Sequence, residues 1–224
     1  MSGGYQLRAT PITIFSHLLF IAITTLLLIW LLKFREGVAF NSSNNFKILN
    51  LHPLLMVIGF VLVGGEAIIT YKAIPAKRRS VRVIHLVLHL IALASAILGI
   101  ITIFKFKNEM SSPNLFSIHM FTLHSWLGII AISSFGLQYI LAFFAYFFPG
   151  AEMSTRASLM PWHRFIGIVI FLLGVCTAET GLVEYFQYLQ LIHQQEALFI
   201  NFTALLLFLY AVFVTLSVIL PGYY

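Results

Sequence analysis

Charged residues are scarce in this sequence, and cysteine is almost absent from it. Lys, Arg, Asp and Glu make up only 9% of the 224 residues, whereas 60% are hydrophobic. Soluble domains carry about 25% charged residues, so this scarcity excludes that class and indicates an integral membrane protein. The single cysteine, Cys176, excludes an internal disulfide, a cluster of thiolate ligands and the CxxCH motif of covalently attached haem. Any cofactor is therefore expected to be held noncovalently.

Long apolar runs are what the sequence has instead. They lie at about 12–32, 53–71, 83–104, 120–148, 162–183 and 197–219, and each is close to the roughly 20 residues that a helix needs to cross a bilayer. The first run is too long for a removable signal peptide and has no small-residue cleavage pattern, so we expect it to remain as a helix. The prediction is an all-α membrane protein, a single domain over residues 1–224 with six transmembrane helices.

Lysine and arginine are distributed unequally between the two sides of such a bundle. Six spans place both termini on one side, which carries Arg8, Lys72, Lys77, Arg78, Arg79, Arg82, Arg156 and Arg164. The opposite side carries fewer, namely Lys33, Arg35, Lys47, Lys105 and Lys107. Cytoplasmic loops retain positive charge, so we predict that both termini are cytoplasmic and refer to that side as inner. The net charge of +6 reflects this topology, and no further basic patch indicates a nucleic-acid partner.

Four of the eight histidines lie near the ends of predicted spans. Because neighbouring spans run in opposite directions, His52 and His124 fall near the outer side, while His85 and His163 fall near the inner side. The helix from His52 to the inner loop rises roughly 30 Å at about 1.5 Å per residue, so one metal ion cannot bind all four. Two separate sites, each with a pair of histidines, are predicted.

Two facing imidazoles in a helical bundle, with no thiolate or carboxylate at the same depth, suit the axial ligation of a haem iron. A zinc site usually has three or four ligands from cysteine, histidine or carboxylate side chains. The alternative is that each histidine is only hydrogen-bonded to a neighbouring helix, since a polar residue in a membrane needs a partner.

Five short stretches resemble the cytochrome b-561 family, a group of transmembrane di-haem proteins that use ascorbate as electron donor. They are LKFREG, HPLLMVIG, GEAIITYK, LHSWLG and STRASLMPWH, and the last is similar to plant members. The resemblance implies six helices, with helices 2–5 forming a haem-binding four-helix bundle and helices 1 and 6 at its periphery. It also implies two haem b groups, with iron ligated by the pairs His52/His124 and His85/His163.

The resemblance further implies substrates and residues that bind them. In the family, basic residues around the cytoplasmic haem receive ascorbate, and the matching positions are Arg78, Arg82 and Arg156. An arginine fork suits a planar anion because it can donate two parallel hydrogen bonds; the alternative is a solvated positive-inside loop. The expected acceptor is a ferric chelate or monodehydroascorbate on the outer side, where we assign Lys107 and Asn114 to its binding.

The outer side departs from the family pattern. Many relatives carry a histidine just after span three, where this sequence has Lys107, and the loop before LHSW is longer and adds His119. We assign His124 rather than His119 as the ligand, because its interval to His163 and its HSWLG context both match the family.

Other polar residues within the spans are less easily assigned. His89 follows the inner ligand of the same span by one helical turn, and it either donates to a haem edge or propionate or bonds a neighbouring helix. Glu66 and Glu179 are functional candidates because ionisable groups are expensive in a membrane, yet the sequence identifies no partner for either. His17 and His193 carry no comparable argument.

A second class of function competes with electron transfer. A transporter or metal-ion carrier without haem could use the histidines and glutamates as relays, but we find no paired discontinuous helices and no repeat symmetry of the kind that marks transporter sites. With electron transfer we expect surrounding membrane lipid, a homodimer, no nucleic acid, and an endomembrane rather than the plasma membrane.

Overall fold

The computed structural model describes residues 9–109, 120–192 and 194–220, and these residues form helices and connections without a strand. Span one is α1 (Ala9–Ile29), which ends in the π-helical turn η1 (Trp30–Phe34). Span two has three consecutive parts, α2 (Asn45–Pro53), the π-helical η2 (Leu54–Leu62) and α3 (Val63–Ala73). The remaining spans are α4 (Arg78–Asn108), α5 (Leu123–Tyr146), α6 (Met153–Tyr188) and α7 (Gln195–Ile219).

Six helices in the described ranges are long and apolar enough to cross a membrane, which confirms the prediction of an all-α membrane protein with six spans. Several helices extend beyond the apolar runs. The largest difference is in α6, which begins at Met153 and continues through Pro161 instead of beginning near residue 162. Apolarity marks only the part of a helix that lies in lipid, whereas the residues before Pro161 are compatible with helix in water.

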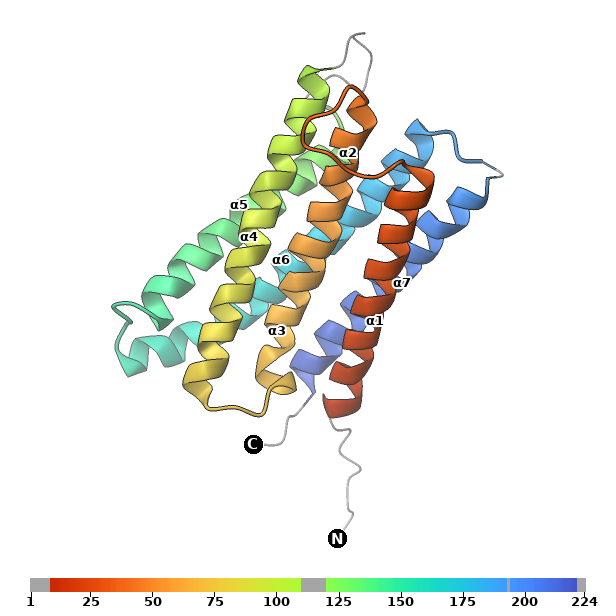
Figure 1. Ribbon diagram of the computed structural model, residues 1–224. Coiled ribbons are helices and arrows are strands. Elements are labelled where there is room, and N and C mark those ends of the chain that lie inside the picture. The colour runs from red at the N-terminus through yellow and green to blue at the C-terminus, as the bar shows by residue number, and fades with distance from the viewer. Residues whose placement is uncertain (1–8, 110–119, 193, 221–224) are drawn as a thin grey trace.

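The helices lie roughly side by side, with the connections alternating between two ends of the molecule (Figure 1). Both ends of the described chain lie with loops 74–77 and 147–152, and this is the inner end as defined from the sequence. Helices α1 and α7 pack against each other on one side, and α5 packs against α6 on the other. The helices of span two and α4 lie between α1 and α5, and α6 also packs directly against α7.

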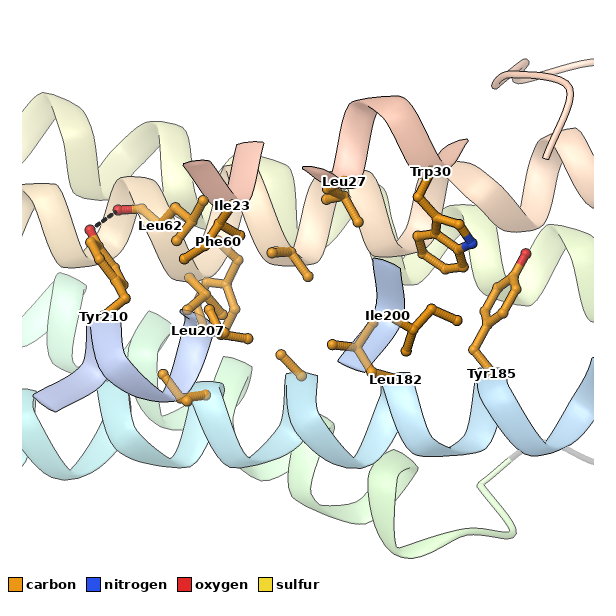
Figure 2. Packing of buried hydrophobic residues seen from close by; sticks show 14 of the residues in the cluster. Ile23, Leu27, Trp30, Phe60, Leu62, Leu182, Tyr185, Ile200, Leu207 and Tyr210 are labelled. Atoms are coloured by element: carbon orange, nitrogen blue, oxygen red, sulfur yellow. Dashed lines mark hydrogen bonds between the residues drawn. The ribbon is translucent and has the colours of Figure 1, made fainter. Parts of the chain in front are cut away.

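A buried apolar core joins the α1–α7 pair to the rest of the bundle. The side chains of Ile23, Leu27, Leu62 and Leu207 have no exposed surface, and Figure 2 shows them packed together between α1, η2 and α7. The outward faces of the helices carry many exposed leucine, isoleucine and phenylalanine side chains. This distribution fits a protein whose surrounding solvent is lipid hydrocarbon.

A buried polar network fixes the outer end of the same helices. Glu196 of α7 is 4% exposed and accepts hydrogen bonds from Trp30 Nε1, at 2.6 Å, and from the guanidinium of Arg35. The side-chain amide of Asn50 donates to the Arg35 carbonyl at 2.8 Å and accepts from the hydroxyl of Tyr185 at 2.7 Å. The network therefore joins the outer end of span one to α2, α6 and α7 through paired polar groups, although Arg35 Nε is buried without a partner.

Candidate functional site

The outer pair of histidines forms between α2 and α5. The ring centres of His52 and His124 are 5.9 Å apart and the ring planes are inclined at 88°. His52 Nδ1 lies 2.9 Å from the carbonyl oxygen of Gly99 on α4, and His124 Nδ1 lies 2.9 Å from that of Thr177 on α6. A carbonyl only accepts, so each Nδ1 carries the proton and each Nε2 keeps a lone pair for a metal.

A largely apolar cavity of about 380 Å³ opens at this pair. It is lined by residues of η2, α4, α5 and α6, among them Phe60, Lys107 and Tyr185. One wall depends on Gly181 of α6, where a Cβ atom would lie 2.7 Å from Cε1 of His124. A glycine is needed there because α6 approaches the imidazole too closely for any side chain.

The inner pair forms between α4 and α6. The ring centres of His85 and His163 are 6.4 Å apart, with the planes inclined at 72°. His85 Nδ1 donates to the carbonyl of Ala67 on α3 at 2.8 Å, which again directs the proton away from Nε2. The side-chain amide of Gln138 on α5 donates to the backbone carbonyl of His163 at 2.9 Å, so all four central helices contribute to this site.

Both pairs have the spacing of two ligands on opposite sides of one metal ion. Histidine nitrogens bind such ions at about 2.0–2.1 Å, which places the centres of two opposed rings about 6 Å apart. Within the described residues, no group of three or more histidine, cysteine, aspartate or glutamate side chains could hold a metal ion. The donor set therefore fits a metal whose remaining ligands come from a cofactor, as in haem.

Unpaired polar atoms beside the inner pair, and one in the first turn of α6, also fit a bound cofactor. His89 Nδ1, Tyr146 Oη and Arg156 Nε are buried without a hydrogen-bond partner. The His89 ring lies 4.4 Å from that of His85, and the Tyr146 ring lies 5.3 Å from that of His163. A buried unsatisfied group costs about 1–3 kcal/mol, and all three atoms can donate to an anionic group such as a propionate.

The arginines assigned to ascorbate lie at the inner end. Arg78 and Arg82 are exposed on the first turns of α4, and Arg156 is half-buried on the first turn of α6. Arg82 Nη1 donates to the backbone carbonyl of Tyr146 at 3.2 Å, and the ring of that tyrosine contacts His163. Arg82 is therefore linked to His163 of the inner pair through a single intervening residue, Tyr146.

The outer acceptor residues are only partly within the described ranges. Lys107 lines the outer cavity beside His52 and His124, whereas Asn114 and His119 lie outside the described residues. The structure places His124 opposite His52, as its assignment over His119 requires.

Comparison with known proteins assigns this architecture to a family. The sequence profile described as eukaryotic cytochrome b561 matches residues 51–188, a range that contains all four paired histidines. This chain belongs to the cytochrome b561 family. A probable ascorbate-specific transmembrane electron transporter 1 of Oryza sativa subsp. japonica is 41% identical, over 98% of this chain and 94% of its own.

Other members of the cytochrome b561 family match over most of this chain. Transmembrane ascorbate ferrireductase 1 of Arabidopsis thaliana is 40% identical, over 95% of this chain and 88% of its own. The transmembrane ascorbate-dependent reductase CYB561 of Ovis aries is 37% identical, over 76% of this chain and 65% of its own. The similarity to plant proteins supports the resemblance seen in STRASLMPWH, and membership of this family implies b-type haem.

The sequence did not allow us to predict one cluster of polar side chains in this cytochrome b561. His17 Nδ1 lies 2.7 Å from a carboxylate oxygen of Glu66, and the Tyr210 hydroxyl lies 3.3 Å from the other oxygen. His17 lies eight residues from the inner end of α1 and Glu66 seven residues from the inner end of α3, a similarity of depth that could have suggested the pair. One carboxylate oxygen of Glu179 is buried without a partner, and His193 lies outside the described residues.

Proposed function

We propose that this protein is a transmembrane oxidoreductase that passes electrons from cytoplasmic ascorbate, through two b-type haems, to an acceptor on the other side of the membrane. The observation that carries the proposal is the presence of two histidine pairs, near opposite ends of one bundle, each at the spacing of opposed metal ligands. The names of the plant and sheep relatives, which refer to ascorbate, support the choice of donor.

His52 and His124 would hold the outer haem, and His85 and His163 the inner one. The haems, when bound, supply reversible one-electron chemistry. The chain contributes the axial nitrogens, and three of the four imidazoles are oriented by backbone carbonyls of neighbouring helices. The apolar lining around the outer pair excludes water and so limits side reactions.

The inner arginines would bind the donor. Ascorbate is an anion at neutral pH, and Arg78, Arg82 and Arg156 occupy the first turns of two helices whose histidines form the inner pair. Such a group of charges attracts an anion over roughly 8 Å at physiological ionic strength. On the outer side, Lys107 and Asn114 would bind the acceptor, a ferric chelate or monodehydroascorbate.

The remaining proposals concern the protein as a whole. We propose a single transmembrane domain over residues 1–224 with both termini cytoplasmic, because the inner end carries more lysine and arginine. We also propose a homodimer in an endomembrane.

The test is an absorption spectrum of the purified full-length chain, with a pyridine haemochrome assay to count haems per chain. We expect reduced bands of bis-histidine haem b and two haems, all extractable with acid acetone because none is covalently attached. Absence of haem would reject electron transfer and favour a transporter or metal-ion carrier.

Single substitutions then test the pairing. His52→Ala and His124→Ala should remove or loosen the same haem, and His85→Ala and His163→Ala the other, because each loses one axial nitrogen. His89→Ala is the matched control: it removes a neighbouring imidazole of the inner pair, and we expect both haems to remain with at most a modest change of potential. Spectra that group the variants differently would refute the pairing.

A further inference from the structure

A cluster of three polar side chains lies outside both histidine pairs, where α1, α3 and α7 meet. His17 Nδ1 is 2.7 Å from Glu66 Oε2. The Tyr210 hydroxyl donates to the carbonyl of Leu62 at 2.8 Å and lies 3.3 Å from Glu66 Oε1. Tyr210 has no exposed surface, while the side chains of Glu66 and His17 are 19% and 43% exposed. An ionisable group at this depth in a membrane is expensive, so its presence points to a function.

This cluster adjoins the contact that orients the inner pair. Glu66 precedes Ala67, whose carbonyl accepts the Nδ1 proton of His85. The groups that face the glutamate are His17 from α1 and Tyr210 from α7, and α4 contributes His85 through the neighbouring peptide. A change in charge at the inner pair therefore acts on a carboxyl group that is one residue from this contact, across a medium of low dielectric constant.

The cluster lies nearer the inner end than the outer end, since His17 is the ninth residue of α1 and Glu66 is seven residues before the last residue of α3. One or two helical turns toward the inner end from its three members lie the buried hydroxyl side chains of Thr13, Thr70 and Ser217. In the opposite direction Thr24 and Thr203 place buried hydroxyl groups two turns away. The same helices also present the fully buried apolar side chains of Ile23, Leu62 and Leu207, which Figure 2 shows packed beside Tyr210. The shorter route for a proton therefore runs between the cluster and the inner face.

We propose that His17, Glu66 and Tyr210 form a proton-loading site that takes up one proton from the inner face when an electron reaches the inner histidine pair. The carboxylate of Glu66 binds the proton, no other bond forms or breaks, and the same proton returns to the inner face when the electron leaves. The physical reason is that an added negative charge in a dry interior is unfavourable unless a positive charge accompanies it. The inference rests on the proposed function, because it requires a redox centre at His85 and His163.

The experiment is a spectroelectrochemical titration of the full-length, haem-loaded protein across the neutral pH range. In the wild type we expect the midpoint potential of the inner haem to fall as pH rises, because proton uptake accompanies reduction. Glu66→Gln should lose this dependence while keeping both haems. Glu179→Gln is the matched control, a second glutamate within a span whose buried oxygen has no partner, and it should keep the wild-type dependence.

Infrared difference spectra between the reduced and oxidised protein give an independent readout. A band from a protonated carboxyl group should appear on reduction of the wild type and be absent from Glu66→Gln. If Glu66→Gln does not fold, Tyr210→Phe removes only the hydroxyl that faces the carboxylate and should shift this band. A purely structural clamp would change the thermal stability of these variants but would produce neither the band nor its shift.

Two outcomes separate this inference from the proposed function. A purified chain that binds no haem refutes the proposed function itself. A chain that binds both haems, but whose inner potential keeps its pH dependence in Glu66→Gln or shows none in the wild type, overturns only the proton-loading site.

Discussion

Gly181→Ala should selectively weaken the outer haem site, because the added methyl group meets the imidazole of His124. The new Cβ would lie 2.7 Å from Cε1 and 3.0 Å from Nδ1 of that ring, whereas carbon atoms in contact are about 3.5–4.0 Å apart. The ring or helix α6 must therefore shift by roughly 1 Å. Overpacking of this kind costs about 1–3 kcal/mol, and loss of the Nδ1 hydrogen bond to Thr177 adds about 1 kcal/mol.

If this total cost of about 2–4 kcal/mol reduces the free energy of haem binding, the affinity for the outer haem falls roughly 30- to 1,000-fold. The assay is the haem content per chain after detergent purification, together with the midpoint potential of each haem. Gly64→Ala is the control, since a Cβ at that position meets nothing within 4 Å. Full haem content with unchanged outer potential in Gly181→Ala would refute the assignment of His124 as a ligand held against α6.

Two further predictions concern the donor site and the stability of the outer end. Arg156→Ala should raise the ascorbate concentration needed for half-maximal reduction without changing reduction by an uncharged donor. Lys107→Ala should leave reduction by ascorbate unchanged. The opposite result in a titration of ascorbate would place the donor on the other side of the membrane. Arg35→Leu leaves the buried carboxylate of Glu196 without its charged partner and should lower the free energy of unfolding by about 3–5 kcal/mol. A thermal melt followed by circular dichroism would detect this loss. A variant as stable as the wild type would show that the ion pair contributes nothing.

The spans and the depths at which the histidines pair could be predicted from the sequence, because the membrane constrains the length and direction of each helix. Helices must run across the bilayer in alternating directions, so the depth of His52 or His163 follows from its distance to the nearest loop. The wall formed by Gly181 could not be predicted in the same way, because it depends on how closely α6 approaches α5. The π-helical segment Leu54–Leu62 was also missed, since its residues are as compatible with an ordinary α-helix.

Contacts between side chains of different helices were the least predictable part of the site. Glu66 was singled out as a candidate without an identified partner, and its contact with His17 was not predicted, because rotation of α1 about its axis decides whether the two side chains meet. The same limitation applied to His89, whose ring was placed on the same face as His85 by helical periodicity alone. The structure adds the contact between the two rings and the unpaired nitrogen.

The carbonyl groups that orient His52, His85 and His124 belong to residues as different as glycine, alanine and threonine. Because every amino acid supplies the same backbone oxygen, substitution of the side chain at these partner positions leaves the acceptor itself in place. The orientation of these three imidazoles therefore depends on how whole helices are positioned along one another. Over evolutionary time such a site can tolerate drift at the partner positions, and an insertion or deletion within a span would be far more damaging than any single replacement there.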